Sequence, residues 1–347
     1  MNRAPPWGTT ATLAHGEKCL NAPDAGDIVG PPAGGTGGHR ALRADTVERS
    51  YNGIVHRTLS SLLRSLRPQQ WLKNGFVFAP LVFSGRVGSS VAWGEAVLAA
   101  AVFSLLASAT YLVNDVRDRE SDRQHPVKRD RPIASGALPV GVALVAAAVL
   151  TVLGAVGSAV LGGRFAGTAA TYLVLTLIYS LFLKELVFVD VLVVAMGFVL
   201  RVVGGALAVR VPVSHWLLLC AFLLALYLAL GKRRSELVLL GAEAADHRAV
   251  LGHYTLPLVD QAISVVLGAT VVAYSLYTVS PGTIAKVGSD RLMVTVPIVL
   301  YGLLRYLYLL HRHELGGSPT RALLTDRPLL AAVLVWLAAA AVVIGIR

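Results

Sequence analysis

From Trp71 onward the sequence alternates between long apolar runs and short charged connections. An α-helix needs about 20 mainly apolar residues to cross the roughly 30 Å hydrocarbon core of a bilayer, and most of these runs are long enough. The first run is short and carries Lys73 and Asn74 near its start. We therefore expect an all-α polytopic membrane protein with nine transmembrane helices, at residues 71–85, 93–113, 138–160, 165–183, 187–209, 214–231, 259–280, 291–310 and 327–346.

The composition excludes a soluble globular domain. Of the 347 residues, 55% are hydrophobic and only 15% are charged, and the mean hydropathy is +0.65. The net charge of +11 does not indicate a nucleic-acid partner, because the cations gather between apolar runs, as membrane topology demands. Cys19 and Cys220 lie in very different settings and suggest no disulfide. The membrane bilayer is the expected environment.

The Lys and Arg residues of the connections predict the orientation of the chain. Cytoplasmic connections of membrane proteins carry an excess of these residues. If the amino terminus lies inside, every cation-rich connection falls on the cytoplasmic side, which predicts a multi-pass plasma-membrane protein whose charged face points to the cytoplasm. The rich connections hold Arg57, Arg64 and Arg67; six cations from Arg117 to Arg131; Lys232, Arg233, Arg234 and Arg248; and Arg312 and Arg321, whereas the poor ones hold Arg86, Arg164, Arg210 and Lys286.

The first 68 residues divide into two parts of different character. Residues 1–53 are rich in Gly and Pro, show no apolar periodicity and contain no apolar segment typical of a signal peptide, so we expect a disordered tail. Residues 54–68 have leucines at helical spacing among arginines, which predicts an amphipathic helix at the membrane surface that ends at Pro68. An ordinary juxtamembrane anchor is the alternative for this helix. Residues 69–347 form the predicted transmembrane domain.

Residues 111–131 join the second and third runs and hold an unusual set of side chains. Asn114, Asp118 and Asp122 are spaced four residues apart, so on an α-helix they lie on one face, flanked by Asp115. The helical rise separates successive members by about 6 Å. Oxygen ligands of this kind suit Mg²⁺, which commonly takes one or two carboxylates and completes its shell with water and substrate phosphates. The pattern therefore predicts a Mg²⁺ site.

The same stretch also favours a polyanionic substrate. The alternative is a solvated, mixed-charge loop between two membrane helices, but acids at this spacing so close to the bilayer are uncommon without a function. The cations that could hold such a substrate are Arg117, Arg119, Arg123, Lys128, Arg129 and Arg131.

Arg201 and Lys184 are the remaining ionisable residues of interest. Arg201 lies well inside the fifth run, where a charge costs roughly 2.5–3.5 kcal/mol, so it should face a cavity and an anion. A structural ion pair with Asp190 is the alternative, although three helical turns separate the two residues. Lys184 ends the fourth run, where the helix dipole alone favours a cation.

These motifs resemble a known family. The sequence Asn114-Asp-Val-Arg-Asp118-Arg-Glu-Ser-Asp122 matches the Asn-Asp-x-x-Asp-x-x-x-Asp signature of the UbiA-type membrane prenyltransferase superfamily. The resemblance covers about residues 60–347 and implies a UbiA-like fold with a central cavity that opens to the cytoplasm. The segments that resemble one branch, the decaprenyl-phosphate phosphoribosyltransferases of actinobacterial arabinan and cell-wall synthesis, are Arg67–Asn74, Tyr111–Asp118, His125–Ile133, Leu183–Lys184 and Gly231–Leu237.

One departure from the wider superfamily supports this branch. Aromatic prenyltransferases carry a second Asp-rich motif in the connection between the sixth and seventh runs, whereas this chain offers Lys232, Arg233, Arg234 and Glu236 there and no Asp-x-x-x-Asp. The resemblance thus implies one diphosphate bound with Mg²⁺ and a separate phosphate, rather than two diphosphate-bound metals.

The resemblance implies a reaction between phosphoribosyl pyrophosphate and a polyprenyl phosphate. Asn114, Asp118 and Asp122 are then the expected catalytic residues, with Asn114 and Asp118 as the Mg²⁺ ligands. The expected contacts to phosphoribosyl pyrophosphate are Lys73, Tyr111, Lys128 and Arg131, and the expected contacts to the lipid phosphate are Lys184 and Arg201.

Two other functions compete with this one. A UbiA-type prenyltransferase could instead use a prenyl diphosphate and an aromatic or other acceptor. A transporter could use Arg201 and the acidic residues to line a path, but the sequence shows no convincing inverted repeat and its charges cluster on one face. A homo-oligomer is left open by the sequence.

Overall fold

The computed structural model describes residues 56–241, 249–312 and 318–345. The predicted tail at residues 1–53 lies outside the described residues, and the compact unit from Gly53 to Arg347 is described by itself. Within the described ranges every regular element is a helix, which confirms the all-α expectation.

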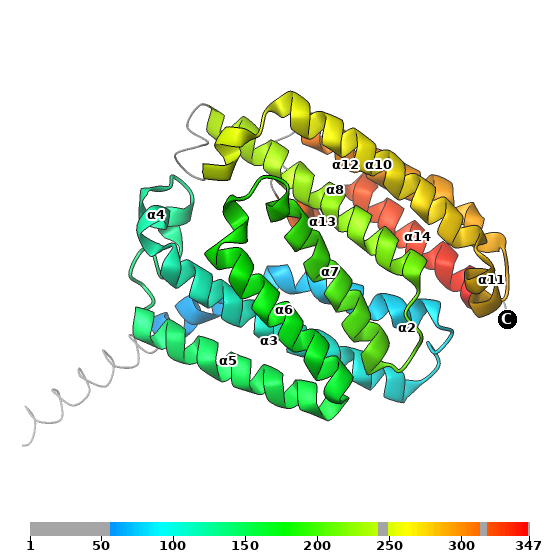
Figure 1. The fold of residues 1–347 in the computed structure, drawn as a ribbon, viewed down its shortest axis with the longest axis horizontal. Coiled ribbons are helices and arrows are strands. Elements are labelled where there is room, and N and C mark those ends of the chain that lie inside the picture. Colours follow the sequence, from blue (N-terminus) through cyan, green and yellow to red (C-terminus); the bar gives the residue numbers. More distant parts are fainter. Residues whose placement is uncertain (1–55, 242–248, 313–317, 346–347) are drawn as a thin grey trace, which may run out of the picture. The chain divides into compact units, whose positions relative to one another are not determined.

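Eight helical segments of this part of the chain are long and apolar enough to cross a membrane. They lie side by side (Figure 1) and coincide with the second to ninth predicted runs. The segments are α3 (Ser90–Arg117), α5 (Val140–Leu161), α6 (Gly163–Leu181), α7 (Val189–Ala208), α8 (His215–Leu240), α10 (Leu256–Val279), η6 (Arg291–Thr295) continued by α12 (Val296–Arg312), and α14 (Arg327–Gly345).

The first predicted run forms a different kind of segment. It consists of the 3₁₀-helix η1 (Pro68–Phe78), 11 residues long, and the 5-residue α2 (Ala79–Phe83). A 3₁₀-helix rises about 2.0 Å per residue against about 1.5 Å for an α-helix, so together they extend over roughly 30 Å. That length equals the thickness of the hydrocarbon core, although the segment is too short for an α-helical span. The count of nine spans stays a prediction.

Contacts at its two ends show that η1 and α2 run the length of the bundle. Before η1, Arg67 donates to the carboxylate of Asp115 at the end of α3. After α2, Arg86 donates to the carbonyl of Val209 at the end of α7, 2.5 Å away. Arg210, the residue after Val209, pairs with Glu95 near the start of α3, whereas Asp115 lies near the end of α3. The two contacts therefore lie at opposite ends of the bundle.

Short helices complete both ends. Residues 111–131, 182–190, 231–241 and 249–256 meet at one end through ion pairs and hydrogen bonds described below, and we call it the charged end. Figure 1 shows α4 at this end and α2 and α11 at the other. The short elements are α4 (Arg119–Gln124), η2 (Lys128–Asp130), η3 (Leu183–Glu185), η5 (Ala249–His253), α11 (Pro281–Val287) and α13 (Pro319–Thr325).

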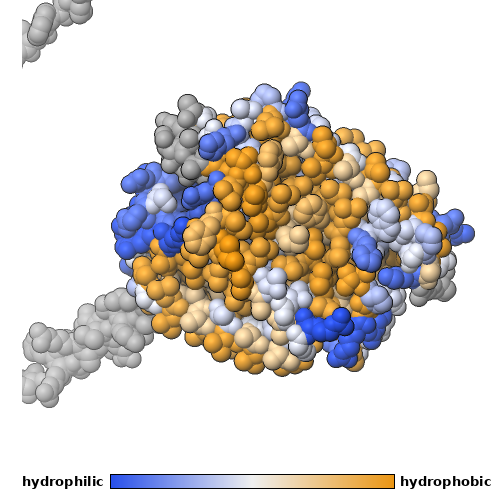
Figure 2. Space-filling model, in the orientation of Figure 1, coloured by the Kyte–Doolittle hydropathy of each residue, from blue (hydrophilic) through white to orange (hydrophobic). Residues whose placement is uncertain are grey.

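The outer surface of the helices is apolar, as a lipid-facing surface must be. Figure 2 shows hydrophobic residues over the middle of the visible face and hydrophilic ones gathered at its two ends. On α5, Val145, Val152 and Val160 are 64%, 62% and 72% exposed, so these three side chains point outward rather than into a core. The membrane environment follows from this surface, because water would not tolerate so large an apolar area.

Close packing joins α7 to the stretched η1. A Cβ atom on Gly205 of α7 would lie 2.0 Å from the backbone oxygen of Val77, so only glycine allows the two backbones to approach this closely. The preceding residue, Gly204, faces the ring of Phe103. This ring also contacts Phe165 and Tyr172 edge-on, with centroids 5.8 and 5.2 Å apart. On its other side, η1 contacts α3, where the side-chain amide of Asn74 donates to the hydroxyl of Ser104, 2.7 Å away.

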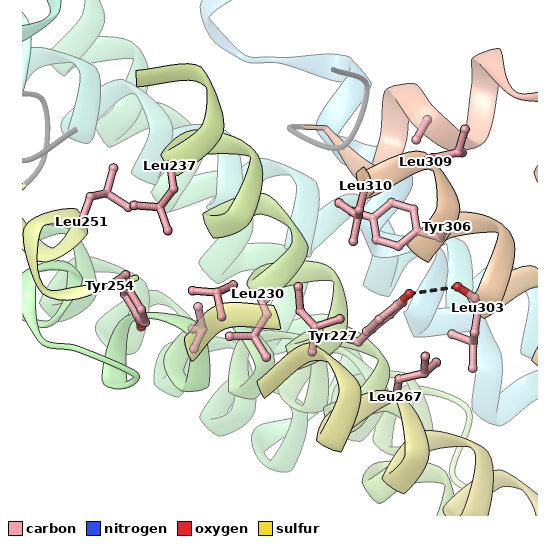
Figure 3. Packing of buried hydrophobic residues seen from close by; sticks show 14 of the residues in the cluster. Tyr227, Leu230, Leu237, Leu251, Tyr254, Leu267, Leu303, Tyr306, Leu309 and Leu310 are labelled. Atoms are coloured by element: carbon pink, nitrogen blue, oxygen red, sulfur yellow. Dashed lines mark hydrogen bonds between the residues drawn. The ribbon is translucent and has the colours of Figure 1, made fainter. Parts of the chain in front are cut away.

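A second core joins α8, α10 and α12 (Figure 3). It is built from leucines and buried tyrosines, and the hydroxyl of Tyr227 donates to the carbonyl of Leu303, 2.9 Å away. Tyr254, which precedes α10, belongs to the same cluster and lies toward the charged end.

The helix at residues 56–65 lies along α3 and α5. Leu62 and Leu66 pack into the apolar cluster of those helices, while Leu59 and Leu63 remain 55% and 52% exposed. The exposed leucines agree with a helix at the membrane surface, which stays a prediction.

Candidate active site

The acidic residues lie where α3 ends. The helix stops at Arg117, and Asp118 both ends α3 and precedes α4. The amide of Asp118 still bonds the carbonyl of Asn114, and the amide of Asp122 bonds the carbonyl of Asp118, each at 2.8 Å. The four-residue spacing is therefore kept across the break, but the change of direction separates the side chains into two groups.

The first group consists of Asn114, Asp118 and Lys184. The side-chain amide of Asn114 donates to Asp118, 3.0 Å away. The ammonium of Lys184, carried by η3, lies 2.8 and 3.1 Å from the two oxygens of the same carboxylate. The side chains of Asp118 and Lys184 are 23% and 18% exposed, so the pair stays accessible to solvent and ligand.

The second group joins Asp115 and Asp122 through one guanidinium. Nη1 of Arg131 lies 3.0 Å from Asp115 and 2.7 Å from Asp122. Asp115 also accepts two bonds from Arg67, at 2.6 and 2.8 Å. Both carboxylates are 3% exposed, and such buried charges persist only because cations surround them. Asp122 thus lies with Asp115 rather than stacked over Asn114 and Asp118, and its expected catalytic role stays a prediction.

Arg67 is a residue that the motifs alone did not identify. Its backbone is left-handed, with φ 53° and ψ 60°, a conformation that is uncommon for any residue except glycine and disfavoured before a proline. The bonds to Asp115 hold it, and its guanidinium lies over the ring of Tyr111, 5.0 Å from the centroid. The sequence signal that could have identified Arg67 was its position in the segment Arg67–Asn74, directly before Pro68.

Two further cations lie close to the charged groups of this end. Lys73 of η1 is half-buried and lies within electrostatic range of Arg67, Arg201 and Lys232. Among the described residues it makes no hydrogen bond or ion pair. Lys128 of η2 is likewise within range of Lys232. The expected contacts Lys73, Tyr111, Lys128 and Arg131 are therefore gathered around one region at the charged end.

Arg201 is buried on α7 without a carboxylate partner in the described part of the chain. Its Nε donates to Asn74, 2.7 Å away, and one Nη donates to the hydroxyl of Tyr172, 2.8 Å away. The other Nη donates to the carbonyl of Gly197 at 2.8 Å. The alternative of an ion pair with Asp190 is wrong, because Asp190 pairs with Arg233. Arg201 therefore brings an uncompensated positive charge into the protein interior.

Burial shifts the ionisation of two groups outside the spans. Burial raises the pKa of Asp122 above its usual range, against the opposing attraction of Arg131. Burial lowers the pKa of Lys128, and the nearby Arg131 lowers it further, while Asp122 acts in the opposite direction. His125 shapes the loop rather than offering a base, because its Nδ1 accepts from the amides of Val127 and Lys128.

Asn114 and Asp118 are the residues that fit a metal ion. The described residues contain no cluster of three or more His, Cys, Asp or Glu side chains suited to a metal. Asp115 and Asp122 are engaged by guanidinium groups, whereas the carboxylate of Asp118 binds a displaceable ammonium with both oxygens. Two oxygen donors suffice for Mg²⁺, which fills its remaining positions with water and substrate phosphates.

A comparison with known protein families shows which family the chain belongs to. The model of the UbiA prenyltransferase family matches residues 76–325. The chain belongs to the UbiA prenyltransferase family. The chain thus belongs to a family of enzymes, which removes the transporter from the candidate functions.

Relatives within the UbiA family are similar over most of their length. The decaprenyl-phosphate phosphoribosyltransferase of Mycobacterium tuberculosis is 35% identical over 284 residues, 81% of this chain and 93% of that protein. The enzyme of the same name from Mycolicibacterium smegmatis is 34% identical over 298 residues, 82% of this chain and 92% of the relative. The sequence resemblance to this branch is confirmed.

A solved structure confirms the UbiA fold. A UbiA homolog from Archaeoglobus fulgidus, bound to GPP and Mg²⁺, superimposes with a TM-score of 0.63 at 18% identity. The match covers 82% of this chain and 99% of that chain.

Proposed function

We propose that this enzyme transfers 5-phosphoribose from phosphoribosyl pyrophosphate to a polyprenyl phosphate, with decaprenyl phosphate as the expected lipid. The products are polyprenyl-phosphoryl-5-phosphoribose and pyrophosphate, and the lipid product would supply cell-wall arabinan synthesis. The observation that carries the proposal is the similarity to decaprenyl-phosphate phosphoribosyltransferases across 93% of the length of the Mycobacterium tuberculosis protein. The geometry of the charged end supports it, in the steps below.

The donor would bind at the acidic residues. Asn114 and Asp118 are the proposed Mg²⁺ ligands, and the metal would neutralise the pyrophosphate group as it leaves. Lys73 and Lys128 would contact the phosphates, with Tyr111 beside them. Arg131 uses one Nη atom to bridge Asp115 and Asp122, and a guanidinium has further donors for a phosphate oxygen.

Asp115 and Asp122 would act indirectly in this arrangement. Both are buried and both bind Arg131, so they fix the guanidinium before the substrate arrives. Such preorganisation is effective because no reorientation is required during the reaction.

The lipid phosphate would meet the cations on the other side of the site. Arg201 is held in place by three neutral groups, so its positive charge is available to an anion. Lys184 would leave Asp118 when the metal binds there, and its ammonium would then contact the lipid phosphate. The polyprenyl chain would extend sideways into the bilayer.

The bond changes require no general base. A lipid phosphate oxygen attacks C1 of the ribose from the face opposite the pyrophosphate, and the C1–oxygen bond to pyrophosphate breaks with its electron pair. Positive charge develops on the ribose ring as the bond breaks. The attacking oxygen is already anionic, so no proton must be removed, which agrees with the engagement of the His125 ring by backbone amides.

The charged end would face the cytoplasm, where phosphoribosyl pyrophosphate is made. The excess of Lys and Arg in the connections at this end supports this orientation.

A two-donor assay tests the proposal. Purified enzyme would receive radiolabelled phosphoribosyl pyrophosphate with decaprenyl phosphate, or a radiolabelled prenyl diphosphate with an aromatic acceptor, each with Mg²⁺. Label in a lipid-extractable phosphoribosyl product from the first pair alone is expected. Transfer of the prenyl group in the second pair, with none in the first, would make the enzyme a UbiA-type prenyltransferase of the ordinary kind.

A further inference from the structure

Asp190 lies at the centre of a buried network that the proposed reaction does not use. It is the second residue of α7, and its side chain is fully buried. Arg233 of α8 donates to one of its oxygens at 2.5 Å, and the hydroxyl of Tyr254 donates to the other at 2.7 Å. Arg233 is only 3% exposed and also binds Glu236. The three members come from three separate parts of the chain.

A buried ion pair of this kind is expensive to form. The desolvation of two charges is repaid only when the geometry is good and the remaining donors are satisfied, and a well-packed apolar pair is often at least as stable. The network therefore needs an explanation beyond stability. The segment that the network holds in place supplies this explanation.

The network contacts both ends of the segment between α6 and α7. At the start of the segment, Arg233 donates to the hydroxyl of Tyr179 on α6, 3.4 Å away. At its end, the amide of Phe188 donates to the hydroxyl of Tyr254 at 2.7 Å. Lys184 lies between these two points, in η3.

The end of this segment is strained and needs such support. Phe188 has φ 61° and ψ −34°, a conformation that residues other than glycine rarely adopt. Its amide bond to Tyr254 and an edge-on contact between the two rings, with centroids 5.5 Å apart, hold it there. The hydroxyl of Tyr254 thus links Asp190 to the backbone of the segment that carries Lys184.

The start of the segment is also fixed to the end of α3, next to Asp118. Arg117, one residue before Asp118, donates to the carbonyl of Ser180 at the end of α6. This contact and the network together hold the segment that carries Lys184. In this position the ammonium of Lys184 reaches both carboxylate oxygens of Asp118.

We propose that Asp190, Arg233 and Tyr254 form a positioning network that sets the place of the Lys184 ammonium against Asp118. None of the three touches a reacting group; they act through the backbone of residues 182–189. What Lys184 then does with a phosphate rests on the proposed function, but its placement does not. The hydroxyl of Tyr254 is the most informative member, because its removal leaves the ring packing and the ion pair intact.

Tyr254→Phe and Tyr227→Phe are the matched variants for the test. Both tyrosines are buried in the cluster shown in Figure 3, and both hydroxyls bond a group on another element. Tyr227 donates to Leu303 of α12, away from the segment that carries Lys184. The readout is the rate of reductive methylation of Lys184 in the full-length protein in detergent, followed by mass spectrometry. Lys286, in α11 at the other end, serves as the internal reference.

The expected result is selective. Methylation of Lys184 should accelerate about three- to tenfold in Tyr254→Phe, the range that loss of one hydrogen bond produces. The rate at Lys286 should not change in this variant, and neither rate should change in Tyr227→Phe. An unchanged Lys184 rate in Tyr254→Phe would overturn the inference. So would equal acceleration at Lys184 and Lys286, which would mean general loosening of the fold.

Kinetics then separate this inference from the proposed function. Tyr254→Phe should raise KM for the lipid phosphate more than it lowers kcat. If the wild-type enzyme transferred no phosphoribose but the methylation pattern held, the network would position Lys184 for another reaction. If transfer occurred and the pattern failed, the proposed function would stand without the network.

Discussion

The ammonium of Lys184 lies 2.8 and 3.1 Å from the two carboxylate oxygens of Asp118, a residue 66 positions earlier in the sequence. The protein's own cation therefore occupies the position proposed for the metal ion. In the proposed reaction, Asn114 and Asp118 would hold Mg²⁺ only after Lys184 has left the carboxylate, and the released ammonium would then be free to contact the second substrate.

Replacement of the carboxylate should stop the reaction and leave the fold intact. We expect Asp118→Ala to lower kcat by about 10²–10³-fold or more, because the leaving group loses its charge stabilisation. Asp118 is part-exposed, so its removal leaves no fully buried charge behind. Transfer assays and thermal unfolding in detergent measure the two effects. Asp260→Ala is the control, because Asp260 pairs with Arg234 outside the site; near-normal turnover by Asp118→Ala would remove the proposed metal role.

Arg201 should matter most to the lipid phosphate. Arg201→Lys keeps the charge but cannot bond Asn74, Tyr172 and Gly197 together, so KM for polyprenyl phosphate should rise about tenfold, as for loss of a charge-assisted hydrogen bond. KM for phosphoribosyl pyrophosphate should change little. Tyr172→Phe removes one of the same bonds and none of the charge, and should change stability more than either KM. Equal kinetics in Arg201→Lys and wild type would make Arg201 structural.

The pH dependence of the first substrate should report Lys128. Burial lowers the pKa of this ammonium below its usual 10.5, so its positive charge is lost at a lower pH than that of an exposed lysine. We expect kcat/KM for phosphoribosyl pyrophosphate, which reports the free enzyme, to fall as the pH rises through this lowered pKa. Lys128→Arg, whose guanidinium stays charged, should remove this limb of the profile. If kcat/KM fell in the same way in Lys128→Arg, the fall would come from another ionisable group.

The close approach of α7 to η1 gives a prediction about stability. Gly205→Ala would drive a Cβ atom into the backbone of Val77, where no side chain can yield, and should destabilise the protein by about 1–3 kcal/mol or more. Gly268→Ala places a methyl group in open space on α10 and should have little effect. Thermal unfolding of the two variants in the same detergent compares them directly. Equal melting temperatures would mean that η1 is not held by this contact.

The sequence predicted the long helices because each is specified locally. A run of apolar residues of sufficient length has few alternatives to a membrane-spanning helix, so eight of the nine expected segments appear as helices, although α8 continues to Leu240, beyond the predicted end at residue 231. The form of the first segment could not be predicted in this way. Its 3₁₀ geometry accompanies a backbone contact between Val77 and Gly205, which are far apart in the chain.

The sequence predicted which residues gather at the candidate site, but not which cation contacts which carboxylate. The spacing of Asn114, Asp118 and Asp122 identified the acidic residues, but the end of α3 at Arg117 divided them between two cations. Which cation meets which carboxylate depends on tertiary structure. For that reason Asp190 was considered as a partner of Arg201, on its own helix, and its true partner Arg233 lies 43 residues away on α8.

The most direct test of the account is the position of a divalent ion. Crystals of the enzyme grown with Mn²⁺ and pyrophosphate would be examined by anomalous scattering at the manganese edge. The account predicts one strong peak between Asn114 and Asp118, adjacent to the diphosphate, with the ammonium of Lys184 moved off the carboxylate. Bound pyrophosphate with no peak at these residues, or with the bond from Lys184 to Asp118 intact, would contradict it.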